Sequence, residues 1–215
     1  MGLNLKTKQL ILRPISIFDQ DSMVDTIMSD RDVMQWLPGS DEVSTLEEQR
    51  EVASVYLKDF TEPWDELGLG IFAVCIRDIE LAPVGTFIGY CGFIAEQIEG
   101  AGPELAYAIG KSMWGKGLAT ESVLACLDWI FIKPKISRVY AVTDIENKSS
   151  RRVMENVGMR HVKDVDLYNS VAKGYGLLPF YSLEREDYLR KRKTLGESPH
   201  FFNLDVIPDV STSSA

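Results

Sequence analysis

A glycine- and lysine-bearing stretch, AYAIGKSMWGKGLATE at residues 106–121, carries the strongest chemical signal in the chain. Gly110, Gly115 and Gly117 lie between a segment that is typical of a strand and a segment that is typical of a helix. The first backbone N–H groups of a helix have no partners within it, and the helix dipole is positive at that end. Glycine adds no Cβ and accepts positive φ, so a ligand can approach closely. The pattern therefore predicts an anion site that favours phosphate.

Three kinds of glycine loop compete for this stretch, beside a turn that binds nothing. A nucleotide-binding P-loop matches Gly110, Gly115 and Lys116, but the next residue must offer a hydroxyl to Mg²⁺ and is Gly117. The dinucleotide pattern GxGxxG fails because Thr120 stands at its third glycine. Another phosphate ligand that suits such a loop is the pyrophosphate of coenzyme A.

The loop WGKGLA, residues 114–119, resembles the [R/Q]xxGx[G/A] loop of the GNAT N-acetyltransferases, with Gly117 and Ala119 at the small positions. Trp114 replaces the usual Arg or Gln, as in the Rim-type (ribosomal-protein N-acetyltransferase-like) branch, whose loop often reads WGKGYATEA. Four further segments resemble this branch in the same order: TKQLILRPIS, SDRDVMQWLP, ELAYAI and NKSSRRVMENVGM. Two of them depart from the branch, with Ala106 in place of Gly and Met159 in place of Phe. The resemblance covers about residues 5–188.

The resemblance implies an α/β (α+β) fold with a mixed, mostly antiparallel central sheet, a splayed parallel strand pair and flanking helices. It implies acetyl-CoA as co-substrate, no metal, and an acyltransferase that moves the acetyl group to a primary amine by direct attack. The implied coenzyme-binding residues are Tyr107, Ala108, Ile109, Trp114, Gly115, Lys116, Gly117, Leu118, Ala119, Thr120, Asn147 and Arg151.

Two residues are candidates for catalysis by the same resemblance. Glu104 matches the family's glutamate before the loop and would act as general base. Ser150 matches the serine of NxxS and would protonate the departing thiolate or orient the coenzyme. Each has a structural alternative, because Glu104 would also suit a solvated loop and Ser150 is expected to cap a helix over residues 150–157.

The most favoured acceptor is a protein or peptide N-terminus. A small amine or polyamine is the second possibility, and a CoA-binding module without turnover is a third. A net charge of −9 argues against nucleic acid as a partner and is compatible with a cationic one. Either a monomer or a homodimer fits the sequence.

The sequence divides into an acetyltransferase domain at 1–193 and a C-terminal tail at 194–215. Hydrophobic patterns and turn residues predict the elements that must hold the site. Strands are expected at 9–13, 71–76, 86–94, 105–109, 138–143, 161–168 and 176–184, and helices at about 19–28, 44–60, 120–132 and 150–157. The strand–helix–strand unit at 105–143 predicts a parallel pair. Pro179 predicts an edge or a bulge in the last strand.

Other residues yield weaker expectations. Trp36 and Trp64 favour core packing over the lining of an acceptor site. Asp59, Glu62, Asp65 and Glu66 favour an exposed loop over an acceptor-attracting cluster.

Three cysteines without a CxxC pair, together with two histidines, argue against zinc or a disulfide framework. They favour buried free thiols and a reducing compartment. The N-terminus has no signal peptide and no apolar run is long enough for a membrane span, so a cytoplasmic location is expected.

Overall fold

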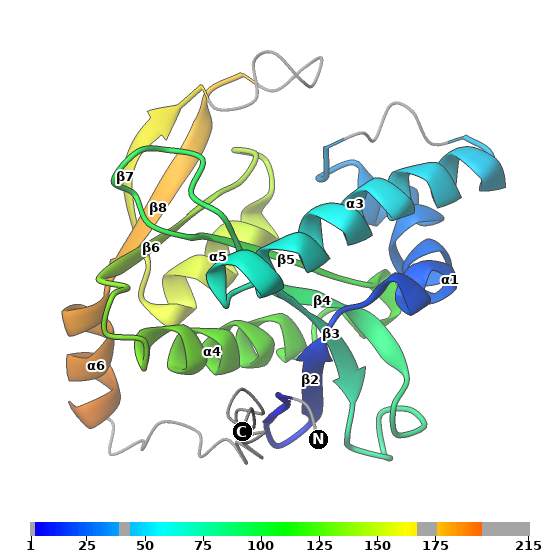
Figure 1. The fold of residues 1–215 in the computed structure, drawn as a ribbon, viewed down its shortest axis with the longest axis horizontal. Helices are drawn as coiled ribbons and strands as arrows, with labels where there is room; N and C mark the ends of the chain where they lie inside the picture. The colour runs from blue at the N-terminus through cyan, green and yellow to red at the C-terminus, as the bar shows by residue number, and fades with distance from the viewer. Residues whose placement is uncertain (1–2, 39–43, 167–175, 195–215) are drawn as a thin grey trace, which may run out of the picture.

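The structure is a computed structural model that describes residues 3–38, 44–166 and 176–194. Its centre is an eight-stranded sheet in the order β1-β2-β3-β4-β5-β6-β8-β7 (Figure 1). The strands are β1 (Leu5–Lys6), β2 (Leu10–Pro14), β3 (Ile71–Ile76), β4 (Phe87–Ile94), β5 (Glu104–Ile109), β6 (Arg138–Val142), β7 (Arg160–Val165) and β8 (Leu178–Glu184). Neighbouring strands are antiparallel except β5 and β6, which are parallel. The expected mixed, mostly antiparallel sheet is confirmed.

Helices cover both faces of this sheet. They are η1 (Ile17–Asp19), α1 (Gln20–Met23), η2 (Val24–Met28), α2 (Arg31–Met34), α3 (Leu46–Leu67), η4 (Lys111–Met113), α4 (Leu118–Phe131), α5 (Lys148–Val157) and α6 (Arg185–Thr194). Successive side chains of a strand point to opposite faces. Ala73 and Cys75 of β3 therefore pack with the N-terminal helices, while Phe72 and Val74 pack in the core that contains α4 and α5.

The parallel strands β5 and β6 form a fork. Strand β5 is paired with β4 along its whole length, but its register with β6 contains one pair, Glu104 with Tyr140. The backbone N–H of Tyr140 donates to Pro103 O at 3.2 Å at the same point. Beyond Glu104 the two strands separate, which confirms the expected splayed pair.

Helix α3 is longer than the sequence indicates. It begins as expected, because Thr45 and Glu48 form a capping box in which Thr45 Oγ1 accepts from the Glu48 N–H at 3.2 Å. The predicted end near residue 60 is wrong, because the helix continues through Pro63 to Leu67. Trp64 fixes this last part of the helix. Its Nε1 donates to Ile71 O at 3.0 Å, and its ring packs edge-on against Phe72 with ring centroids 4.9 Å apart. Tertiary contacts here outweigh the helix-breaking tendency of proline.

Three other details of the prediction are corrected. Asn147, rather than Ser150, caps α5, because its Oδ1 accepts from the Ser150 N–H at 3.0 Å. Strand β8 lies between β6 and β7 instead of at an edge, and the register irregularity of its pairing with β7 falls in β7, between His161 and Lys163, instead of in β8. Proline has no backbone N–H to donate to a neighbouring strand. Pro179 is tolerated because its register partner is Asp164 of β7, and the pairing of β8 with β6 begins only at the next residue, Phe180. Helix α6 was not expected from the sequence, and most of the predicted 194–215 tail lies outside the described residues.

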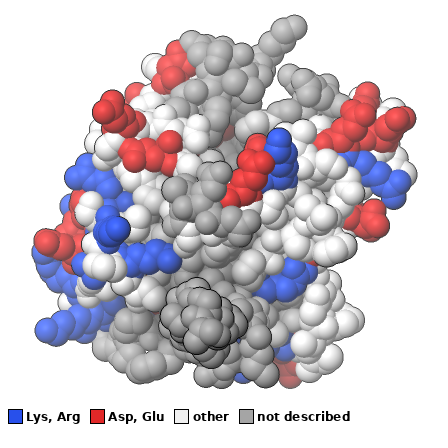
Figure 2. Space-filling view, viewed as in Figure 1, with Lys and Arg blue, Asp and Glu red and all other residues white. Residues whose placement is uncertain are grey.

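Charges at the helix ends follow the helix dipole. Acidic side chains Glu47 and Glu48 occupy the first turn of α3, and basic ones occupy the last turn of α6. Figure 2 shows basic residues over α6 at the lower left and acidic residues over the start of α3 at the upper right.

The free thiols of Cys75, Cys91 and Cys126 are all buried, as expected. Burial raises the pKa of the Cys75 and Cys126 thiols above the usual value. Among the described residues, no cluster of His, Cys, Asp or Glu is arranged to hold a metal ion. Nor is any helix in that part of the chain both long and apolar enough to cross a bilayer.

Candidate functional site

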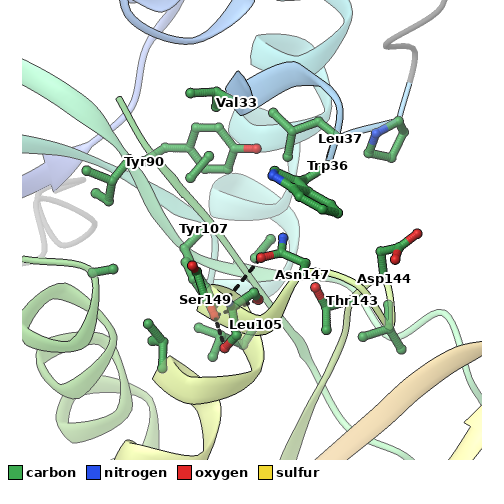
Figure 3. Close-up of a pocket in the computed structure, with 18 of the residues that line it drawn as sticks. Val33, Trp36, Leu37, Tyr90, Leu105, Tyr107, Thr143, Asp144, Asn147 and Ser149 are labelled. Carbon is green, nitrogen blue, oxygen red and sulfur yellow. Dashed lines mark hydrogen bonds between the residues drawn. The ribbon is translucent and has the colours of Figure 1, made fainter. Parts of the chain in front are cut away.

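A cleft of about 1650 Å³ follows the fork between β5 and β6. Residues of α2 and α3 line one side, the β5–α4 loop and the start of α5 line the other, and β4 and β5 contribute the sheet between them. Figure 3 shows Trp36 and Leu37 on one side of this cleft and Thr143 and Asp144 on the other. The cleft therefore joins the N-terminal helices to the glycine loop across the opening of the fork.

The glycine loop has the backbone that its sequence predicts. Gly115 and Gly117 have φ of 76° and 77°, in the left-handed region that favours glycine. A Cβ built on either residue would meet no protein atom within 4 Å. Protein packing therefore does not require glycine here, whereas the backbone conformation does, and the space beside both residues is open to a ligand.

Gly117 is also the N-cap of α4, and no side chain caps this helix. In the described chain, the first backbone N–H of α4 with a protein acceptor is that of Glu121, which donates to Gly117 O at 3.0 Å. The N–H groups of Leu118, Ala119 and Thr120 come before it, and all three residues line the cleft. Together with the helix dipole, they make this turn suited to an anion.

Trp114 joins the loop to the end of β5. Its indole Nε1 donates to Ile109 O at 2.6 Å, and the side chain is 45% exposed and lines the cleft. This contact occupies the last carbonyl of β5 and ties the loop to the strand.

The edge of β5 that faces the fork presents backbone N–H and C=O groups toward the cleft. Because Pro103 O faces β6 and these groups alternate along a strand, those of Tyr107 and Ile109 face the same way. The N–H of Gly110 donates in the other direction, to Ile88 O of β4 at 2.8 Å. With Ile109 O taken by Trp114, the N–H and C=O of Tyr107 are presented at the opening of the fork.

Tyr107, Ser150 and Asn147 form a linked group at the cleft, and Figure 3 shows two of them, Tyr107 and Asn147. Tyr107 Oη lies 2.9 Å from Ser150 Oγ and donates to Ser150 O at 3.0 Å. The Asn147 side chain in turn accepts from the Ser150 N–H. Burial raises the pKa of the Tyr107 phenol far above its ordinary value, so it stays protonated at neutral pH. The group therefore places two hydroxyls, each able to donate a proton, beside β5.

Glu104 is buried at the fork, with 5% of its surface exposed. Tyr140 Oη donates to Glu104 Oε2 at 2.8 Å, and Glu104 lines the cleft. The alternative of a solvated loop carboxylate is therefore wrong. By alternation, Glu104 shares a face of β5 with Ala106 and Ala108, which pack toward the N-terminal helices.

Two expected coenzyme-binding residues do not line the cleft. Lys116 Nζ donates to Ser112 O at 2.6 Å. Arg151 donates from Nε to Tyr181 Oη at 3.1 Å and from a terminal nitrogen to Ile145 O at 3.3 Å. Its neighbour Arg152 does line the cleft. The roles of Lys116 and Arg151 stay predictions.

Sequence reasoning missed residues on the helical side. The prediction of core packing is wrong for Trp36, which lines the cleft. It is confirmed for Trp64, which packs against the core. Asp59 and Glu62 lie on α3 and line the cleft instead of an exposed loop. The side chains of Asp65 and Glu66 lie outside the described ones. The spacing of three residues between Asp59 and Glu62 could have indicated that they share a face of α3.

Charge is divided along the cleft. Carboxylates line it at Asp32, Glu51, Asp59, Glu62, Glu104, Asp144 and Glu146, and basic side chains line it at Lys148 and Arg152. The α2 and α3 side contributes carboxylates alone, whereas the β6–α5 loop and α5 contribute two carboxylates and both basic residues. The α2 and α3 side therefore favours a cation, and charges of both signs balance on the α5 side.

A mixed sheet that forks beside a glycine loop at a helix start is the architecture of acyltransferases that use a coenzyme A thioester. The chain belongs to the GNAT family, since the model of the Acetyltransferase (GNAT) domain matches residues 9–160. The protein is therefore an N-acetyltransferase.

Several known proteins are similar to this chain in sequence or in fold. Uncharacterized protein YkkB of Bacillus subtilis (strain 168) is 28% identical over 191 residues, which cover 86% of this chain and 99% of the relative. The ribosomal-protein-S5-alanine acetyltransferase from Vibrio fischeri shares the fold with a TM-score of 0.68 at 16% identity, over 87% of this chain and 99% of the other. RimJ of Mycobacterium smegmatis, in complex with CoA-disulfide, has a TM-score of 0.63 at 18% identity, over 87% of this chain and 90% of the other.

Proposed function

We propose that the protein transfers the acetyl group of acetyl-CoA to the N-terminal α-amine of a protein or peptide. The observation that carries this proposal is a buried carboxylate, Glu104, at the head of the fork and on the face of the N-terminal helices. Fold relatives whose names assign them ribosomal-protein substrates support a protein acceptor.

The coenzyme would bind on the glycine-loop side of the cleft. The backbone N–H groups of residues 115–120 suit the pyrophosphate, and the exposed C=O of Tyr107 suits an amide N–H of an arm that adds beside β5. The Tyr107 N–H would then stabilise the negative charge that develops on the thioester oxygen. Arg152 and Lys148, which line this side, would balance phosphate charge.

The reaction needs one base and one acid. A neutral amine nitrogen attacks the thioester carbonyl carbon, the N–C bond forms and the C–S bond breaks. The proton lost by the amine passes to Glu104, directly or through one water, and the departing thiolate takes a proton from Ser150 Oγ. Tyr107 Oη, 2.9 Å from that oxygen, can return a proton to it.

The pKa of the acceptor favours an α-amine. A lysine side chain with a pKa of about 10.4 is neutral only a few times in ten thousand at pH 7, whereas an α-amine with a pKa of about 7.7–8.0 is neutral roughly one time in ten. One carboxylate is an adequate base for the second case. The carboxylates on α3 instead favour a small polyamine, which is the second candidate acceptor.

A comparison of acceptors tests the proposal. Peptides with a free N-terminus should be acetylated with a kcat/KM at least about tenfold higher than the same peptides with a blocked N-terminus and a free lysine, because of the amine pKa. Coenzyme A release and the mass of the product measure this. Faster turnover of spermidine than of every free-N-terminus peptide in a diverse set would contradict the proposal.

Replacing Ser150 by alanine should lower kcat by about a hundredfold, the lower end of the range for loss of an acid–base group. The coenzyme dissociation constant, measured by calorimetry, should change little because the N-cap is supplied by Asn147. Ser182→Ala is the matched control, since this half-buried serine donates to Val139 O at 3.4 Å outside the cleft. Equal kcat values for the two variants would remove the acid role from Ser150.

A further inference from the structure

We propose that Tyr140 is a positioning residue that holds the Glu104 carboxylate at the head of the fork. This inference rests on the proposed role of Glu104 as the base. It concerns the contact that fixes the Glu104 side chain in place. The glycine loop and the coenzyme side of the cleft do not supply that contact.

The Tyr140 side chain is held on several sides. It is fully buried, and its ring stacks on Phe180 with centroids 5.1 Å apart and planes 15° apart. Its phenol oxygen accepts from the backbone N–H of Gln97 at 3.1 Å. With the ring immobile and this acceptor position filled, the hydroxyl proton is directed at Glu104 Oε2, 2.8 Å away.

The sheet places this hydrogen bond where the strands part. Glu104 and Tyr140 are the pair that sets the register of β5 and β6, so their side chains are neighbours on the same face. One position further along, β5 has left β6 and the cleft begins. The fork that opens the site for substrates thus also carries the contact that orients the base.

The contact with Tyr140 takes only part of what the carboxylate can accept. An ionised carboxylate has about four acceptor positions on its two oxygens, and the Tyr140 hydroxyl takes one of them, on Oε2. Positioning within a fraction of an ångström matters, since a shift of about 1 Å can cost about 10² in rate.

The test is a double-mutant cycle with Tyr140→Phe and Glu104→Gln. Tyr140→Phe should lower kcat about tenfold, with the KM for acetyl-CoA and the calorimetric affinity for coenzyme A changed less than about twofold, because the coenzyme side is untouched. In the Glu104→Gln background, Tyr140→Phe should cause no further loss of kcat, because both changes remove one function.

Tyr188→Phe is the matched control, since this tyrosine is equally buried and donates to Asp128 at 2.7 Å away from the cleft. It should lower thermal stability and leave kcat unchanged. Should Tyr140→Phe fail to fold, Phe180→Leu keeps the phenol but removes the ring stack, and it should lower kcat with unchanged coenzyme affinity.

Two results distinguish failure of the positioning role of Tyr140 from failure of the base assignment of Glu104. A Tyr140→Phe kcat equal to that of the parent, or losses that multiply in the double variant, overturns the positioning role while the base assignment stands. Full activity of Glu104→Gln overturns the base assignment and this inference with it.

Discussion

The Glu104→Gln variant is expected to acetylate a peptide N-terminus with a kcat about 10²- to 10⁴-fold below the parent value at pH 7, the usual range for loss of a general base. Glutamine has nearly the same shape and keeps an oxygen that can accept from Tyr140, so the fold should survive. Coenzyme A affinity, measured by calorimetry, should remain within about twofold because Glu104 lies on the face of the N-terminal helices.

The pH dependence gives this prediction a second readout. Above about pH 8 the α-amine becomes neutral without help, so the difference between the variant and the parent should shrink as pH rises. Glu96→Gln is the matched control, because Glu96 is exposed, accepts from the Ala101 N–H at 2.9 Å and does not line the cleft. A Glu104→Gln enzyme as fast as the Glu96→Gln enzyme would show that another group removes the proton.

The Gly117→Val variant is expected to bind coenzyme A about ten- to a hundredfold more weakly. Valine at a φ of 77° is strained, and left-handed backbone costs a residue with a Cβ about 1–2 kcal/mol. Relief of that strain would turn the N–H groups of the first turn of α4 away from a shared anion. The side chain would also fill the open space beside the loop.

Gly85→Val separates this effect from general strain. Gly85 has a φ of 89° and, like Gly117, no protein atom within 4 Å of a built Cβ, but it lies in the β3–β4 turn. Both variants should lose thermal stability, and Gly117→Val alone should lose calorimetric affinity for coenzyme A. Equal affinities in the two variants would mean that the glycine loop does not hold the pyrophosphate.

Much of the fold could be predicted because its elements have local signals. The apolar run over Ile71–Ile76 and the helix that ends before Pro134 are examples, as is the C-terminal cap of α5 at Gly158, with a φ of 102°. The misses occurred where distant contacts decide. Trp64 extends α3 past Pro63 by bonding to β3, and α6 buries Tyr188 and Arg192 against Asp128 of α4.

The site, like the fold, has parts that the local sequence predicts and parts that depend on distant contacts. The glycine loop was predictable because its conformation depends on residues that are adjacent in sequence. Tyr140 was not, because it lies 36 residues from Glu104 and meets it only through the register of two strands. Ser150 and Asn147 are both good capping residues, and a choice between them requires the position at which α5 begins.

The burial of Cys75, Cys91 and Cys126 has a practical consequence for work on this enzyme. Burial keeps all three thiols away from a disulfide reagent and raises the pKa of the Cys75 and Cys126 thiols, so a chromogenic reagent present during turnover should colour with released coenzyme and spare the folded protein. The same reagent would reveal a damaged variant, since its interior sulfurs would begin to titrate before any substrate is added.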